Sequence, residues 1–173
     1  MEIKGYKAFS EDLTNKYGVP FDEGKQYKVS GKISFGNEGN GYHMCTHISD
    51  VFRYVDAVSS EVKVAVVIGS GECVCFNDEY EGYYDMYACE EIYIERILTR
   101  EEVISLMLKQ HDFDVMKFIK TFKMNYNETL LFFSAFKGRM DIEKMLLYYQ
   151  CGCKDVYNTG YKRLVLKYGQ NCD

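Results

Sequence analysis

The segment Gly41-Tyr42-His43-Met44-Cys45-Thr46-His47-Ile48-Ser49-Asp50-Val51-Phe52-Arg53-Tyr54 decides the fold, because the hydrophobic period changes inside it. A glycine precedes a stretch at 42–46 that suits a β-strand. Apolar residues then recur at the spacing of one helix face: Ile48, Val51, Phe52 and Val55. We therefore predict a strand that runs directly into a helix. Two of the three histidines and one of the seven cysteines lie at this junction.

Further strands are expected on both sides of the junction. Upstream, alternation and turn residues predict strands at 3–9, 26–30 and 32–35. Downstream, the β-branched run 62–68 is typical of a central strand, and the turn Gly69-Ser70-Gly71 predicts that it pairs with 72–76 as a hairpin. A last strand, or pair of strands, is expected at 86–98.

At Thr99 the period becomes helical. Thr99 and Glu102 form the Thr-x-x-Glu pattern of a capping box, and only helices are expected beyond it. Four further helix starts are predicted, at Asp112, Asn127, Asp141 and Thr159. We therefore predict an α+β protein with a mostly antiparallel sheet domain at 1–98 and a helical domain at 99–173 that leans on it.

Composition excludes some classes of function. The formal net charge is -5 and the sequence pI is about 5.3, which argues against a general binder of nucleic acid or of anionic membranes. The charged start lacks a signal peptide, and no apolar run approaches membrane-spanning length. We expect a cytoplasmic protein with mostly buried, reduced thiols.

The stretch Glu128–Tyr149 resembles an ankyrin repeat unit. It has a short helix, a glycine at Gly138, Asp141-Ile142 at the start of a second helix, and the pair Leu146-Leu147. The Thr-Pro-Leu-His opening of such a unit is absent. A plain bundle of helical hairpins is the alternative.

The N-terminal part resembles an uncharacterised domain of small phage and prophage proteins. The resemblance rests on Gly5-Tyr6-Lys7-Ala8-Phe9, on Gly41-Tyr42-His43-Met44-Cys45 and on Asp50-Val51-Phe52-Arg53-Tyr54, and it covers roughly the first hundred residues. It implies an origin in a mobile element. It brings no activity with it.

The same part is also weakly similar to ADP-ribosyltransferases. That resemblance would place Lys7, His43 and Glu91 at the catalytic positions, and Tyr42 and Tyr54 against a bound NAD cofactor. The chemistry needs an aromatic ring on the nicotinamide and a carboxylate that steadies the oxocarbenium character of the breaking glycosidic bond. Lysine and histidine replace the residues that the family carries at the first two positions.

A zinc site is a further alternative, although no metal is our leading prediction. On one strand His43, Cys45 and His47 would share a face, and Cys73 with Cys75 on a neighbouring strand would complete a tetrahedral set. The spacing is not one of the common zinc patterns. Buried thiols and a surface or capping histidine are the simpler interpretation.

An acidic stretch rich in tyrosine, residues 78–85, is the predicted partner-binding surface. Tyr80, Tyr83 and Tyr84 lie among carboxylates there, and such rings are common at the centres of interfaces. We predict a non-enzymatic phage or mobile-element protein that binds a host or phage protein, with no cofactor, no nucleic acid and no membrane. NAD-dependent transfer and zinc binding are the alternatives.

Overall fold

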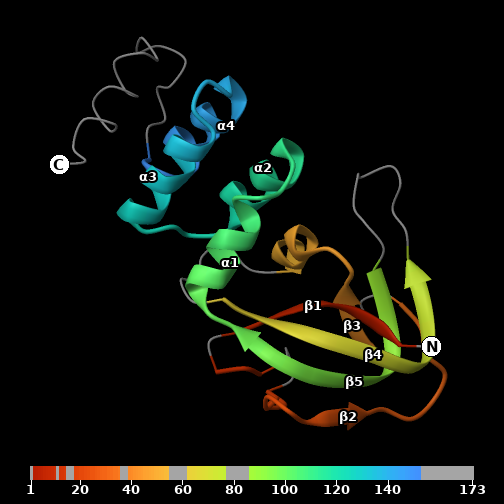
Figure 1. The fold of residues 1–173 in the computed structure, drawn as a ribbon. Coiled ribbons are helices and arrows are strands. Elements are labelled where there is room, and N and C mark those ends of the chain that lie inside the picture. Colours follow the sequence, from red (N-terminus) through yellow and green to blue (C-terminus); the bar gives the residue numbers. More distant parts are fainter. Residues whose placement is uncertain are drawn as a thin grey trace.

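The structure is a computed structural model that describes residues 2–10, 12–14, 18–35, 39–54, 62–76 and 86–152. An antiparallel sheet is followed by helices, and this confirms the predicted α+β class (Figure 1). The strands are β1 (Ile3–Phe9), β2 (Gln26–Lys28), β3 (Tyr42–Cys45), β4 (Lys63–Phe76) and β5 (Met86–Leu98). The helices are α1 (Arg100–Met107), α2 (Asp112–Thr121), α3 (Tyr126–Ala135) and α4 (Met140–Met145), with a 3₁₀ segment η1 (Ile48–Tyr54) and a π-helical segment η2 (Leu146–Gln150).

The sheet curls onto itself. Its strand order is β2-β5-β3-β1-β4, and β4 also pairs with β5, so β5, β3, β1 and β4 close a ring. One hydrophobic cluster fills the inside of this ring and contains Met44, Ala65, Val67 and Cys89. The outer face of β4 carries Val64 and Val66, because neighbouring residues of a strand point to opposite faces.

The predicted hairpin at Gly69-Ser70-Gly71 is wrong, because β4 runs through this turn-like sequence as one strand. The pairing with β5 shifts register between Ser70 and Cys73, and Gly71 takes a φ of 76° there. The glycine therefore serves a β-bulge inside a long strand and not a reversal of the chain. The part of β4 after Gly69 pairs with β5, which the local turn signal does not reveal.

Two other predicted elements differ from the structure. Residues 32–35 are not a strand, because the Ser34 amide donates to the Asn40 carbonyl and the Asn40 amide group donates to two carbonyls of the same loop. The helix after the junction strand is η1, a 3₁₀ helix, in which the Asp50 amide bonds the carbonyl of His47.

The predicted helix starts are right to within a few residues. Thr99 caps α1 with the expected capping box, completed by Glu102. In α3 the capping box is formed by Asn125 with Glu128, and not by Asn127. His111 precedes α2, whose first residue is Asp112, and α4 begins at Met140, one residue before Asp141. The predicted fifth helix lies outside the described residues, and the ankyrin resemblance stays a prediction.

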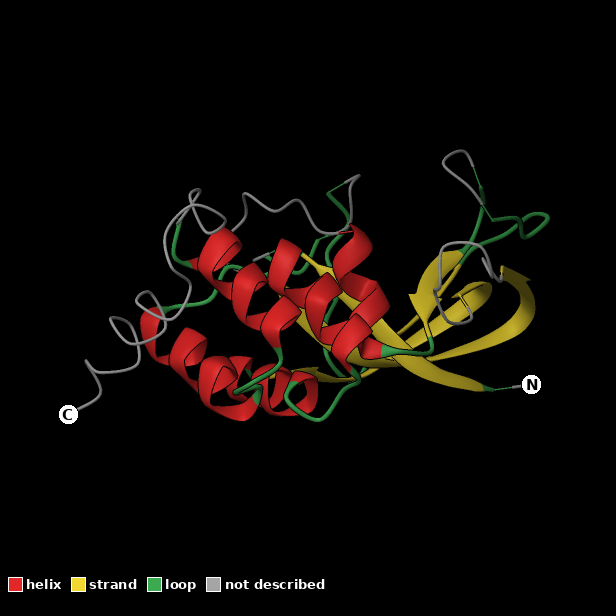
Figure 2. Cartoon of the chain, turned by 90° about the horizontal axis from the view of Figure 1, so that it is seen from above, coloured by secondary structure: helices red, strands yellow, loops and turns green. Residues whose placement is uncertain are grey.

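The described helices lie to one side of the strands, with η1 between sheet and helices (Figure 1, Figure 2). A single hydrophobic cluster joins Val64 and Leu98 of the sheet, Phe52 of η1, and Phe118 and Phe132 of the helices. The side chains of η1 and α2 meet edge to face, since the Phe52 and Phe118 ring centroids are 4.8 Å apart at 76°. The hydrophobic core therefore continues across residue 99. Within the described ranges no helix has the length and apolar character to cross a membrane.

We expect the Phe118→Ala substitution to lower the free energy of unfolding by about 3–5 kcal/mol, because the ring is fully buried between η1 and α3 and leaves a cavity. Phe113→Ala on the same helix should lower it by less than about 1 kcal/mol, since that ring is exposed. Urea denaturation of both variants measures the difference. Equal losses would contradict a core shared by sheet and helices.

Candidate functional site

Lys7 lies on the inner face of the sheet, opposite Ala65 of β4. Its ammonium donates a 2.7 Å hydrogen bond to the backbone carbonyl of His43 and lies 5.7 Å from the centroid of the Phe9 ring. Burial of this charged end lowers the pKa of Lys7 to about 8, against a smaller opposite effect of Cys45. Lys7 is thus an amine that is partly neutral slightly above neutral pH.

The ring of His43 lies on the other face of the sheet. His43 pairs with Ala88, and its ring centroid is 4.7 Å from that of Phe35, which in turn stacks on Phe76 at 4.9 Å. The structure therefore brings Lys7 to the backbone of His43 but places the imidazole in an aromatic group on the outside.

Glu91 lies far along the sheet from Lys7. It pairs with Ser70 on β4, whereas Lys7 pairs with Ala65, five residues away on the same strand. At the rise of a β-strand this is roughly 16 Å, and the odd separation puts the two side chains on opposite faces. The Glu91 carboxylate accepts hydrogen bonds from Lys28, Gln26 and Ser70, and those from Lys28 lower its pKa. No described contact joins it to Lys7 or His43.

The predicted cofactor residues also lie apart from this carboxylate. Tyr42 packs inside the ring of strands, 6.0 Å from Phe21 with the rings perpendicular, and burial raises its pKa. Tyr54 ends η1, and its side chain lies outside the described part. The predicted partner residues Tyr80, Tyr83 and Tyr84 are also outside the described residues.

The residues of the zinc alternative fall on two faces. Cys73 is paired with Cys89, which is also paired with Tyr42, and all three belong to the cluster inside the ring. His43 and Cys45 share the outer face with Ala88 and Met86. Among the described residues, no three His, Cys, Asp or Glu side chains are grouped so that they could hold a metal ion.

A buried polar contact between η1 and α2 was not expected from the sequence. Lys117 of α2 lies 3.0 Å from Asp50 and 3.4 Å from Asp114, and the Ser49 hydroxyl donates to Asp114 at 3.0 Å. Ser49, Asp50 and Asp114 are at most 1 % exposed. Charges buried this deeply must be paired, so the contact fixes how η1 sits on α2. The only sequence signal for this contact is a polar residue at helical spacing within an apolar stripe, and this signal is weak.

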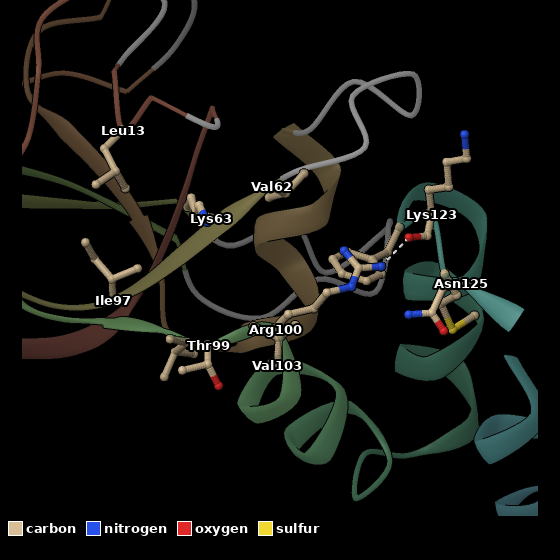
Figure 3. Close-up of a pocket in the computed structure, with 12 residues that line it drawn as sticks. Leu13, Val62, Lys63, Ile97, Thr99, Arg100, Val103, Lys123 and Asn125 are labelled. Atoms are coloured by element: carbon tan, nitrogen blue, oxygen red, sulfur yellow. Dashed lines mark hydrogen bonds between the residues drawn. The ribbon is translucent and has the colours of Figure 1, made fainter. Parts of the chain in front are cut away.

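A cleft of about 770 Å³ lies where the sheet meets the helices (Figure 3). One wall comes from the ends of β4 and β5 with Val62, Ile97 and Leu98. The other comes from α1 and the α2–α3 connection with Val103, Phe122 and Met124. Thr99, Lys123 and Asn125 also line the cleft and are exposed, so it opens to the surface.

The rim of this junction cleft is basic. Lys63, Arg100 and Lys123 are among its twelve lining residues, and none of the twelve is acidic. The N-caps of α1 and α3, Thr99 and Asn125, lie on the same rim, where the capping-box carboxylates of Glu102 and Glu128 offset the positive ends of the two helix dipoles. Lys63 and Lys123 therefore give this apolar-walled cleft a basic rim in a chain whose net charge is -5, whereas the charge of Arg100 is paired with Glu128.

Arg100 holds the two walls together. Its guanidinium makes two parallel contacts with Glu128 of α3, 2.5 Å from Nε and 2.8 Å from Nη2, and donates to the Lys123 carbonyl at 2.6 Å (Figure 3). It also lies over the Phe122 ring, 4.5 Å from the centroid. Burial raises the pKa of Glu128, but the bonds from Arg100 and from the Asn125 amide outweigh it, and the pKa is lowered. Such fork-shaped pairs are stronger and more directional than single ones.

We expect Arg100→Lys to lower the free energy of unfolding by about 1–3 kcal/mol, because an ammonium cannot make the forked contact or stack on Phe122. The matched control is Arg96→Lys, which changes an exposed single contact with Glu102 and should cost less than about 1 kcal/mol. Chemical denaturation of both variants compares them. A control as damaging as Arg100→Lys would contradict the role of the fork.

Lys7 gives a prediction about pH. Its pKa is about 8 in the folded chain and near 10.5 when unfolded, so the unfolded state binds more protons between these values and stability should rise with pH there. Below pH 8 Lys7 is charged in both states, so its burial lowers the free energy of unfolding by an amount that does not change with pH. Replacement by methionine should therefore flatten the rise of the unfolding free energy between about pH 8 and 10.5. An unchanged slope in Lys7→Met would show that the ammonium is solvated.

Of the comparisons with known proteins, one finds a match, and it covers the sheet part of the chain. A protein-family model described as a domain of unknown function (DUF7666) matches residues 3–106, which include all five strands, η1 and most of α1. No curated protein matches the chain. No solved structure matches it either.

Proposed function

We propose that this chain, which belongs to the DUF7666 family of domains of unknown function, acts by binding another protein in its junction cleft and not as an enzyme. The observation that supports the proposal is the pairing of apolar walls with a basic rim in a hollow of about 770 Å³. A partner segment with one or two apolar side chains flanked by carboxylates fits both features. In keeping with the resemblance of the N-terminal part, we propose a phage or mobile-element protein and a host or phage partner.

The shape of the cleft favours a protein segment over an enclosed small molecule. Three of its lining residues are exposed, so a side chain can enter while the rest of the partner stays outside. The walls come from two parts of the chain that the Arg100 fork and a shared core hold at a fixed spacing. A preformed site of this kind loses little conformational entropy on binding.

NAD-dependent transfer is the alternative that the sequence motifs raise, and no observation favours it. Glu91 is held by Lys28 on the outer face of the sheet, and Lys7 bonds a backbone carbonyl on the inner face. Catalysis of glycosidic bond breakage would require these groups around one reacting centre. Zinc binding is likewise not favoured within the described residues.

The proposal is tested by reversing the charge of the rim. In affinity purification from host lysate, with and without phage infection, the double variant Lys63→Glu/Lys123→Glu should lose a protein that the wild-type chain captures. The control Lys120→Glu/Lys137→Glu makes the same change in net charge at exposed lysines that do not line the cleft, and it should keep that protein.

Calorimetry with the purified partner then measures the loss directly. We expect the rim variant to bind at least about 10-fold more weakly, which corresponds to about 1.4 kcal/mol. Capture that is equal in both double variants, or the absence of any captured protein, would contradict binding in the junction cleft.

A further inference from the structure

Two thiols face each other across the β4–β5 pair, far from the junction cleft. Cys73 and Cys89 are directly paired residues of the antiparallel ladder, and their sulfur atoms are 3.0 Å apart. Cys89 has no exposed surface, whereas Cys73 is partly exposed. The first thiol is therefore out of reach of a reagent in solution, and the second is within reach.

The surroundings hold the two sulfur atoms together. A Cβ built on Gly69 would lie 2.5 Å from the Cys89 sulfur and 2.7 Å from the Met44 sulfur, so the missing side chain provides the space that this thiol occupies. The bulge between Ser70 and Cys73 sets the register that puts Cys73 opposite Cys89. Burial raises the pKa of Cys89, with a further rise from the Cys73 contact, so the Cys89 thiol is neutral at rest.

We propose that Cys73 and Cys89 form a thiol-oxidation site that small-molecule disulfides convert to an intramolecular disulfide. Directly opposed strand residues have Cβ atoms about 4.5–5.5 Å apart, close to the spacing that a disulfide needs. Closing the bond requires the sulfur atoms to approach by about 1 Å from their present 3.0 Å. No strand has to leave the sheet for this movement.

The reaction proceeds by two exchanges. The Cys73 thiolate attacks one sulfur of the small disulfide, whose S–S bond breaks, and one small thiolate leaves. Cys89 then gives up its proton and attacks the Cys73 sulfur of the mixed disulfide, and the second small thiolate leaves. The two protein thiols lose two electrons and two protons in total, and the small disulfide gains them as two thiols.

Cys45 and Cys75 are less suited to this reaction. Cys75 is exposed but pairs with Tyr87, so no thiol lies opposite it in the ladder. Cys45 is buried and belongs to the core cluster on the other face of the sheet. Cys75 therefore serves as the internal control, because it is accessible and two residues from Cys73.

The test is incubation of the whole reduced chain with oxidised glutathione, followed by intact mass measurement and mapping of disulfide-linked peptides. We expect the loss of two hydrogen masses and a peptide that links Cys73 to Cys89. On Cys75 we expect at most a mixed disulfide. The mapping on the wild-type chain decides the question even if a variant fails to fold.

Two variants sharpen the result. Cys73→Ser should abolish the cross-link, whereas Cys75→Ser should form it at the wild-type rate, and circular dichroism reports whether each has folded. The oxidised wild-type chain should also melt several degrees higher, reversibly with dithiothreitol, because the bond closes the loop between the two strands. A glutathione adduct that stays on Cys73, a link from Cys73 to Cys75, or no reaction under conditions that modify Cys75 would each overturn the proposal.

Discussion

The forked contact between Arg100 and Glu128 is the interaction on which the arrangement of this molecule depends. Arg100 is the first residue of α1, directly after the strand that leaves the sheet, and Glu128 belongs to the capping box of α3. One guanidinium thus ties the exit of the sheet to Glu128, 28 residues later, in the first turn of α3. Because it also stacks on Phe122 and bonds the Lys123 carbonyl, it positions the connection that forms one wall of the cleft.

The hydrophobic core shared by sheet and helices supports the contact between Arg100 and Glu128. Phe52 and Phe118 are fully buried between the sheet and the later helices, and the contact of Lys117 with Asp50 and Asp114 fixes the same interface through charge. The cleft lies at the edge of this interface, between the ends of β4 and β5 on one side and α1 with the α2–α3 connection on the other. Lys63 and Lys123 make the rim of this cleft basic.

The sequence predicts those features that depend on neighbouring residues. Local patterns predict the alternation over Ile3–Phe9, a strand or pair of strands at 86–98 and the capping box at Thr99. The structure has strands and a capping box where they were expected, with 86–98 as one strand. The turn signal at Gly69-Ser70-Gly71 misleads, because pairing with β5 decides whether those glycines form a reversal or a bulge. Local sequence carries no information about a partner strand that lies twenty residues further on.

The residues of the candidate site also depend on strand register, which local sequence does not reveal. Lys7 and His43 fall on neighbouring strands as the motifs imply, but the side-chain alternation that puts them on opposite faces depends on the register between the strands. No sequence motif links Arg100 to Glu128. Each residue, taken alone, has the pattern of a solvated charge on its own helix. The buried thiol of Cys89 and the partly exposed thiol of Cys73 meet only because the bulge sets their register.

The most direct test of a single core across residue 99 is native-state hydrogen exchange of the whole chain, read at the amides of β4 and of α2. The Phe122 amide, which bonds the Phe118 carbonyl at 2.8 Å, is a suitable reporter for the helices. If sheet and helices unfold as one unit, the slowest amides of both elements should give the same opening free energy, equal to that of global unfolding. Opening of α2 at a free energy lower by about 2 kcal/mol or more, with β4 still protected, would show two separate units and contradict the account.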